Sequence, residues 1–211
     1  MASASARAKS ILRILKKTYP EADCALVHGN PFELLVSTIL SAQCTDKRVN
    51  MVTPGLFKKY KSARDFAQAR LPELESEIRT TGFFRQKARW IKAAADKLVT
   101  NFGGRVPRAM VDLLTLPGVA RKTVNVVLGT AYQISEGIVV DTHVGRIARR
   151  LRLSRESDPV KVERDLVRAV PRKDWIWFSH ALITHGRQVC KALRPLCAGC
   201  PLVQVCPSRE V

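Results

Sequence analysis

Helix-forming signals follow one another along this sequence and leave almost no room for a sheet. Asn30 followed by Pro31 is typical of a helix N-cap with a first-turn proline. Apolar side chains recur at helical spacing over residues 85–101, before a pair of glycines. The only candidate strand is Ile138–Val140, which is too short to build a sheet. We therefore expect an all-α protein.

Other segments carry similar signals. Ile11, Leu12 and Leu15 form one apolar face of an expected helix near the N-terminus. Further helices are expected after a capping box at Ser62 and Asp65, over Arg121–Tyr132, after Asp158 and Pro159, and over Asp174–His185, where Gly186 is expected to end the helix. The chain is thus expected to consist of helices joined by short loops.

A sharp reversal is expected within Leu116–Thr123, because Pro117 and Gly118 are turn-forming residues between two expected helices. The second helix then starts with unpaired N–H groups at the positive end of its dipole, and such a start binds phosphate. Arg121 and Lys122 add positive charge beside it. An ordinary corner between helices is the alternative interpretation.

Lys122 is the candidate nucleophile of this hairpin. A lysine attacks only as the neutral amine, and the positive end of a helix dipole disfavours the ammonium ion. Burial beside other cations would disfavour that ion further. The alternative is a lysine that simply pairs with phosphate.

Asp141 ends an apolar stretch and precedes a further expected helix, a position typical of an N-cap. A carboxylate near the hairpin could also stabilise a positive charge developing on a sugar, or accept a proton. The two roles are compatible. His143, two residues later, is on its own expected to fill a hydrogen-bond network.

Four of the six cysteines lie within the last 22 residues. Cys190, Cys197, Cys200 and Cys206 follow the pattern C-x6-C-x2-C-x5-C. With no export signal in the sequence, metal binding is expected rather than disulfides. Structural zinc generally uses two close pairs, whereas one close pair here has a single cysteine on either side. The spacing favours a [4Fe-4S] cluster, with zinc as the alternative.

Charge points to a polyanionic partner. The chain has 36 Lys and Arg against 18 Asp and Glu, a formal net charge of +18. Nucleic acid is the first candidate, and a merely solvated basic surface is the alternative. No stretch approaches the roughly 20 apolar residues of a membrane helix, and no signal-peptide core follows the N-terminus. The first ten residues lack acids, as transit peptides do, but they are few, so we expect a cytoplasmic protein.

Together these motifs resemble the helix–hairpin–helix DNA glycosylases. The pattern L-P-G-V-x-R-K-T from Leu116, followed about 20 residues later by V-D-T-H-V-x-R from Val140, is similar to the bifunctional branch, which carries a hairpin lysine. The resemblance covers nearly the whole chain. It extends to Leu40–Asp46, Thr81–Phe83, His185–Arg187 and the cysteine spacing.

The resemblance implies two helical domains with a DNA cleft between them. Residues 24–135 would form a six-helix barrel with the helix–hairpin–helix, and residues 1–23 and 136–211 a domain holding a [4Fe-4S] cluster. It implies a monomeric bacterial enzyme, associated with the nucleoid, that acts on double-stranded DNA with damaged bases or abasic sites. Oxidised pyrimidines such as thymine glycol would be removed. Lys122 would attack the sugar C1′ and form a Schiff base, β-elimination would cut 3′ to the lesion, and Asp141 would assist.

DNA contacts are also implied. Gln43 and Phe83 would fill the gap left by a flipped nucleotide. Backbone contacts would come from the hairpin and its surroundings, namely Gly118, Ala120, Arg121, Thr123 and His143. Near the cysteines, Arg187, Lys191 and Arg194 are expected to face phosphates once the cluster has folded their loop.

Two residues depart from the family pattern. Ala120 replaces the second hairpin glycine, so a left-handed backbone there would be costly. Phe83 replaces leucine, and this larger wedge is expected to unstack bases while altering lesion preference. Two alternatives remain: a monofunctional glycosylase, which would lack Lys122, and a non-catalytic DNA-binding or electron-transfer protein, which would need neither Lys122 nor Asp141.

Overall fold

The computed structural model describes residues 4–209, and this part of the chain contains helices and loops without a strand. The all-α prediction is therefore confirmed. The segment 138–140, the candidate strand, forms none: the Val139 N–H donates to Ser179 Oγ at 3.0 Å instead of joining a ladder. The chain divides into two compact units, Cys24–Ile134 and the combination of Met1–Asp23 with Ser135–Val211.

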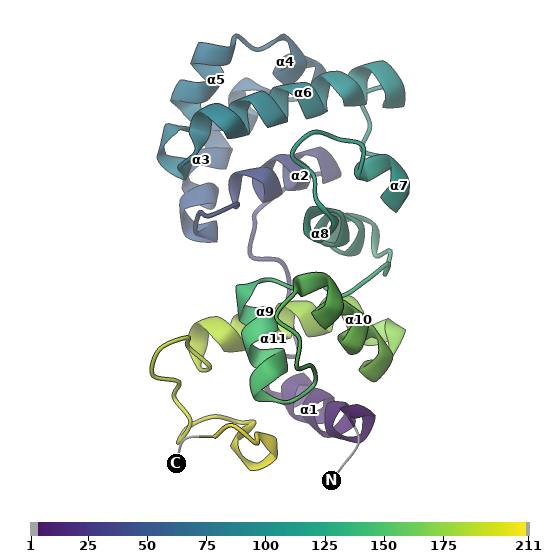
Figure 1. The fold of residues 1–211 in the computed structure, drawn as a ribbon. Coiled ribbons are helices and arrows are strands. Elements are labelled where there is room, and N and C mark those ends of the chain that lie inside the picture. Colours follow the sequence, from purple (N-terminus) through teal and green to yellow (C-terminus); the bar gives the residue numbers. More distant parts are fainter. Residues whose placement is uncertain (1–3, 210–211) are drawn as a thin grey trace. The chain divides into compact units, whose positions relative to one another are not determined.

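The unit Cys24–Ile134 is organised around its longest helix, α6, which packs against α4 and α5, while α2 packs against α8 (Figure 1). Its core includes Phe66, whose ring contacts those of Phe32, Phe57 and Tyr60. The helices are α2 (Pro31–Leu40), α3 (Asp46–Lys59), α4 (Ala63–Gln68), α5 (Leu71–Glu77), the 3-10 helix η1 (Arg79–Thr81), α6 (Phe84–Phe102), α7 (Met110–Leu113) and α8 (Arg121–Tyr132).

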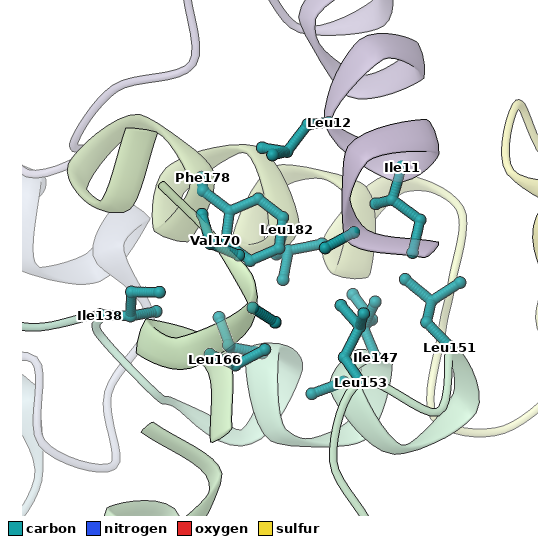
Figure 2. Packing of buried hydrophobic residues seen from close by; sticks show 14 of the residues in the cluster. Ile11, Leu12, Ile138, Ile147, Leu151, Leu153, Leu166, Val170, Phe178 and Leu182 are labelled. Carbon is teal, nitrogen blue, oxygen red and sulfur yellow. The ribbon is translucent and has the colours of Figure 1, made fainter. Parts of the chain in front are cut away.

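The other unit joins the N-terminal helix to the C-terminal part of the chain. Helix α1 packs against α10, and α9 packs against α10 and α11. Figure 2 shows Ile11 and Leu12 of α1 beside Phe178 and Leu182 of α11 in one apolar cluster. The helices are α1 (Ala4–Thr18), α9 (Thr142–Arg150), α10 (Pro159–Ala169), η2 (Arg172–Asp174), α11 (Trp175–Gln188) and η3 (Val203–Val205).

Side-chain caps set several helix starts, as predicted. Asn30 Oδ1 accepts from the Glu33 N–H at 3.0 Å at the start of α2. Ser62 and Asp65 form a reciprocal capping box at the start of α4. Asp158 caps α10 by accepting from a first-turn N–H. These helix starts are local properties of the sequence, which is why caps predict them.

One predicted helix end is wrong. Helix α11 does not end at Gly186 but continues to Gln188. Gly186 is buried, and a Cβ on it would lie 2.8 Å from Cβ and Nδ1 of His143 in α9. The glycine therefore allows two helices to approach closely and does not end α11.

No helix in the part of the chain that the structure describes combines the length and the apolar character needed to cross a bilayer.

The apolar cluster of Figure 2 gives a stability prediction. Phe178 is 0% exposed, so Phe178→Ala leaves a cavity and should lower the free energy of unfolding by about 3–5 kcal/mol. Denaturant unfolding monitored by tryptophan fluorescence measures this. Leu193 in the same unit is 85% exposed, and Leu193→Ala is the control, expected to change stability by less than about 0.5 kcal/mol. Similar losses for both variants would contradict the assigned core.

Candidate active site and cysteine cavity

The hairpin Leu116–Thr123 turns at Gly118, whose φ is +74°. A Cβ at Gly118 would lie 2.7 Å from Cβ and Cγ of Trp90, so the backbone rests directly on that side chain. The turn is closed by the Val119 N–H, which donates to the Leu116 carbonyl at 3.2 Å. Both the positive φ and the close contact require glycine at this position.

Helix α8 follows this turn, and Ala120 is its N-cap residue. Its φ of −103° and ψ of 169° are extended, a conformation that alanine adopts without strain. The strain expected for a left-handed backbone at Ala120 is therefore absent. Ala120 offers no side-chain cap to the first N–H groups of α8. A helix start without a side-chain cap from its N-cap residue is suited to bind an anion.

Lys122 is the second residue of α8, and its side chain is exposed. The burial that would help to disfavour the Lys122 ammonium ion is therefore not present in the unbound protein. Arg121 is also exposed, and its Nη1 lies 3.2 Å from Met110 Sδ. Thr123, the next residue, is half-buried. The exposed amine can reach a large ligand that approaches the hairpin.

Asp141 is the N-cap of α9, as one of its two predicted roles required. Its Oδ1 accepts from the Val144 N–H at 2.8 Å, and the residue is half-buried. His143 joins a hydrogen-bond network, with Nδ1 3.0 Å from Nη2 of Arg146. The same Nη2 donates to the carbonyls of Gly186 and Cys190 at 3.1 and 2.8 Å. Asp141 and Lys122 belong to different units of the chain.

The two predicted wedge residues share an unusual backbone. Gln43 has φ +51° and Phe83 has φ +47°, in the left-handed region that non-glycine residues rarely occupy. Both are exposed, and Phe83 is 66% exposed despite its aromatic side chain. Such strained conformations persist only where surrounding structure holds them, and they cluster at functional sites.

The four C-terminal cysteines line one cavity of about 430 Å³, including its open mouth. Arg150 reaches this region from α9, with Nη1 3.2 Å from Cys190 Sγ and 2.7 Å from the Lys191 carbonyl. On another side, His185 Nε2 lies 3.6 Å from Cys200 Sγ, and Tyr19 OH lies 3.0 Å from His185 Nδ1. Side chains of α9 and α11 thus contact the cysteine loop, and Tyr19, directly after α1, contacts His185 behind it.

The thiols in this cavity are costly to ionise unless positive charge, such as that of iron, lies between them. Burial raises the pKa of the Cys200 thiol, and the neighbouring cysteines raise it further. The same causes raise the pKa of Cys206. Burial also lowers the pKa of His185 to about 4, so the imidazole beside the cysteines is neutral near pH 7. Iron would reverse the cost of ionising these thiols, because bound metal stabilises thiolates.

The four cysteines line one open cavity, and a multi-atom cluster needs such a volume between its ligands. The donor set therefore fits a [4Fe-4S] group by residue type, by number and by its placement around one cavity.

The basic residues near the cysteines are exposed. Arg187 lies in the last turn of α11, and Lys191 and Arg194 lie in the loop that follows. Arg194 has a left-handed backbone with φ +55°. The structure thus places three exposed cations next to the cysteine cavity.

Some contributing residues were not predicted from the sequence. Lys87, Arg150 and Trp90 each support a loop described above. A signal existed for Lys87, which lies four residues before Ile91 on the apolar face of α6. The roles of Arg150 and Trp90 depend on contacts between distant segments, which leave no local pattern.

Comparisons with known proteins agree with this geometry. Residues 36–172 match the family described as HhH-GPD superfamily base excision DNA repair protein. The chain is 53% identical over 210 residues to endonuclease III of Synechocystis sp., covering 100% of this chain and 96% of that protein. It is 48% identical over 189 residues to endonuclease III of Bacillus subtilis, covering 89% and 86% of the two chains.

Solved structures show the same relationship. A non-covalent endonuclease III–DNA complex matches with a TM-score of 0.93 and 42% identity, covering 99% of this chain and 97% of that one. A trapped endonuclease III–DNA covalent intermediate matches with the same values. A thermostable thymine-DNA glycosylase shares the fold, with a TM-score of 0.86 at 22% identity over 96% of each chain. The chain therefore belongs to the HhH-GPD superfamily of base excision DNA repair proteins and, within it, to the endonuclease III family.

Proposed function

We propose that this protein is a bifunctional DNA glycosylase and abasic-site lyase that removes oxidised pyrimidines, such as thymine glycol, from double-stranded DNA. The observation that carries the proposal is the exposed amine of Lys122 on the first turn of α8, directly after a Pro-Gly hairpin. The DNA complexes of relatives with 42% identity support the choice of ligand. We further propose that the protein acts as a monomer on nucleoid DNA in the bacterial cytoplasm.

In the proposed reaction, the Lys122 amine in its neutral form attacks C1′ of the damaged nucleotide. The bond from C1′ to the base nitrogen breaks, and the base leaves with that electron pair and takes up a proton. Ring opening then gives a Schiff base between Nζ and C1′. Loss of a C2′ proton expels the 3′ phosphate, which cuts the strand 3′ to the lesion. Hydrolysis of the Schiff base frees the lysine.

Other residues support this chemistry. The N–H groups at the start of α8 and the side chains of Arg121 and Thr123 bind the DNA backbone, together with Gly118, Ala120 and His143. Gln43 and Phe83 fill the space left by the extruded nucleotide. The Asp141 carboxylate stabilises positive charge that develops on the sugar, while it also caps α9.

A [4Fe-4S] cluster is proposed on Cys190, Cys197, Cys200 and Cys206. The four thiols around one cavity and the membership of the endonuclease III family support this assignment. When bound, the cluster cross-links the loop between the cysteines. Lys191 and Arg194 then face DNA phosphates from a fixed loop, beside Arg187 in the last turn of α11.

The nucleophile assignment gives the first functional prediction. Borohydride reduction of the wild-type protein with DNA carrying an abasic site should trap a covalent adduct, and Lys122→Ala should trap none. The control is Lys58→Ala, which removes another exposed lysine of the same unit and should trap normally. Denaturing electrophoresis measures the adduct. Trapping by Lys122→Ala at the wild-type level would refute the assignment.

Asp141→Asn separates capping from catalysis, because asparagine caps a helix as well as aspartate but carries no charge. This variant should keep the wild-type melting temperature and DNA affinity, and its single-turnover rate of base release should fall by about a hundredfold or more. Thermal unfolding and quench-flow measurements test the two halves of the prediction. A normal rate would leave Asp141 only a capping role.

The basic loop predicts a salt effect. Arg194→Asn removes one cation, and asparagine tolerates the left-handed backbone at φ +55°. DNA affinity should fall equally for all sequences, and the slope of log affinity against log salt should become shallower by about one. Fluorescence anisotropy over a salt series measures both. Arg194→Lys should keep the wild-type slope, and an unchanged slope in Arg194→Asn would exclude a phosphate contact.

A further inference from the structure

Lys87 is a lysine buried within the unit Cys24–Ile134. It lies on α6 and is 1% exposed, which is rare for lysine. Burial lowers the pKa of its ammonium group, and the nearby Cys44 raises that pKa by less. Burying an amine is costly unless its donors are satisfied. Its hydrogen bonds therefore show what the residue is for.

The side chain joins the ends of two helices. Lys87 Nζ donates to the Leu40 carbonyl at 2.7 Å and to the Thr81 carbonyl at 2.7 Å. Leu40 is the last residue of α2, and Thr81 is the last residue of the 3-10 helix η1. Carbonyls at helix ends lack partners within the helix and favour a cation. One amine thus caps both ends.

Both capped ends lead directly to the wedge residues. Gln43 follows Leu40 by three positions, and Phe83 follows Thr81 by two. Each of these two residues is held in a left-handed conformation. The Lys87 backbone N–H also donates to the Phe83 carbonyl at 3.0 Å. Lys87 therefore contacts the loop that carries Gln43 once, at Leu40. It contacts the loop that carries Phe83 twice, at Thr81 and at Phe83 itself.

We propose that Lys87 is a positioning residue that holds the loops carrying Gln43 and Phe83 in one arrangement, so that both side chains enter the duplex together. The proposal rests on the proposed base-excision function, since it assumes that these residues replace an extruded nucleotide. Lys87 itself is buried and does not touch the substrate. Its loss frees two helix ends and allows Gln43 and Phe83 to leave their strained conformations.

The chain provides a matched control. Lys92 lies on the same helix, is half-buried, and donates from Nζ to the carbonyls of Ala67 and Ala69. It therefore also donates to two backbone carbonyls, but both lie at the C-terminal end of α4 and not in the loops of Gln43 or Phe83. Lys87→Met and Lys92→Met remove the same chemical group from one helix, and each removes donors to two backbone carbonyls.

The experiment compares two substrates under single-turnover conditions. A duplex with one thymine glycol requires unstacking, whereas a single-stranded oligonucleotide with an abasic site requires only the lyase steps. Lys87→Met should lower base release from the duplex by about tenfold to a hundredfold, because small misplacements of this kind cost that much. Cleavage of the single strand should stay within about twofold of wild type. Lys92→Met should leave both rates unchanged.

The fluorescence of 2-aminopurine directly reports whether Gln43 and Phe83 enter the duplex. With 2-aminopurine opposite the lesion, fluorescence should rise when wild type or Lys92→Met binds, and should rise much less with Lys87→Met. Lys87→Arg retains donors for both carbonyls and should restore most of the signal. If Lys87→Met does not fold by circular dichroism, Lys87→Gln, which keeps one donor group, takes its place and should give an intermediate loss.

Two outcomes would overturn the proposal: equal losses on both substrates, or a full 2-aminopurine signal from folded Lys87→Met. Failure of the proposed function is distinguishable, because wild type would then cleave neither substrate. In that case the 2-aminopurine signal would still show whether Lys87 controls insertion into the duplex.

Discussion

Gly118 packs directly on the Trp90 side chain, and this contact fixes where α8 begins. With φ +74° and no room for a Cβ, only glycine fits the backbone at this point. The turn directs the uncapped start of α8, and with it Lys122, toward solvent. The proposed chemistry depends on this arrangement, because the amine and the phosphate-binding N–H groups belong to the same helical turn.

Helix ends carry most of the proposed function. The start of α8 has no side-chain cap from its N-cap residue, whereas the start of α9 is capped by the Asp141 side chain. At the C-terminal ends of α2 and η1, the Lys87 amine donates to the last carbonyl of each helix. These ends lie just before the loops that carry Gln43 and Phe83. In the proposed function, the buried Lys87 amine holds the strained loops of Gln43 and Phe83 without contacting the ligand. The exposed side chains would then meet DNA while a buried residue fixes their geometry.

The sequence predicted what depends on neighbours along the chain. The all-α class and the caps at Asn30 and Asp141 follow from short patterns, and the structure contains them. Features that depend on distant segments were missed or misjudged. Gly186 resembled a helix stop but allows His143 to approach, and Lys87 contributes through carbonyls that are remote in sequence. Hydrophobic patterns and caps do not encode such pairings.

The proposed reaction depends on a covalent bond between the Lys122 amine and the sugar. A crystal structure of the borohydride-reduced protein with DNA carrying an abasic site would show this bond. We expect continuous density between Lys122 Nζ and C1′, with the backbone N–H groups at the start of α8 on an adjacent phosphate. Density joining the sugar to a different side chain, or a Lys122 amine remote from any sugar, would contradict it.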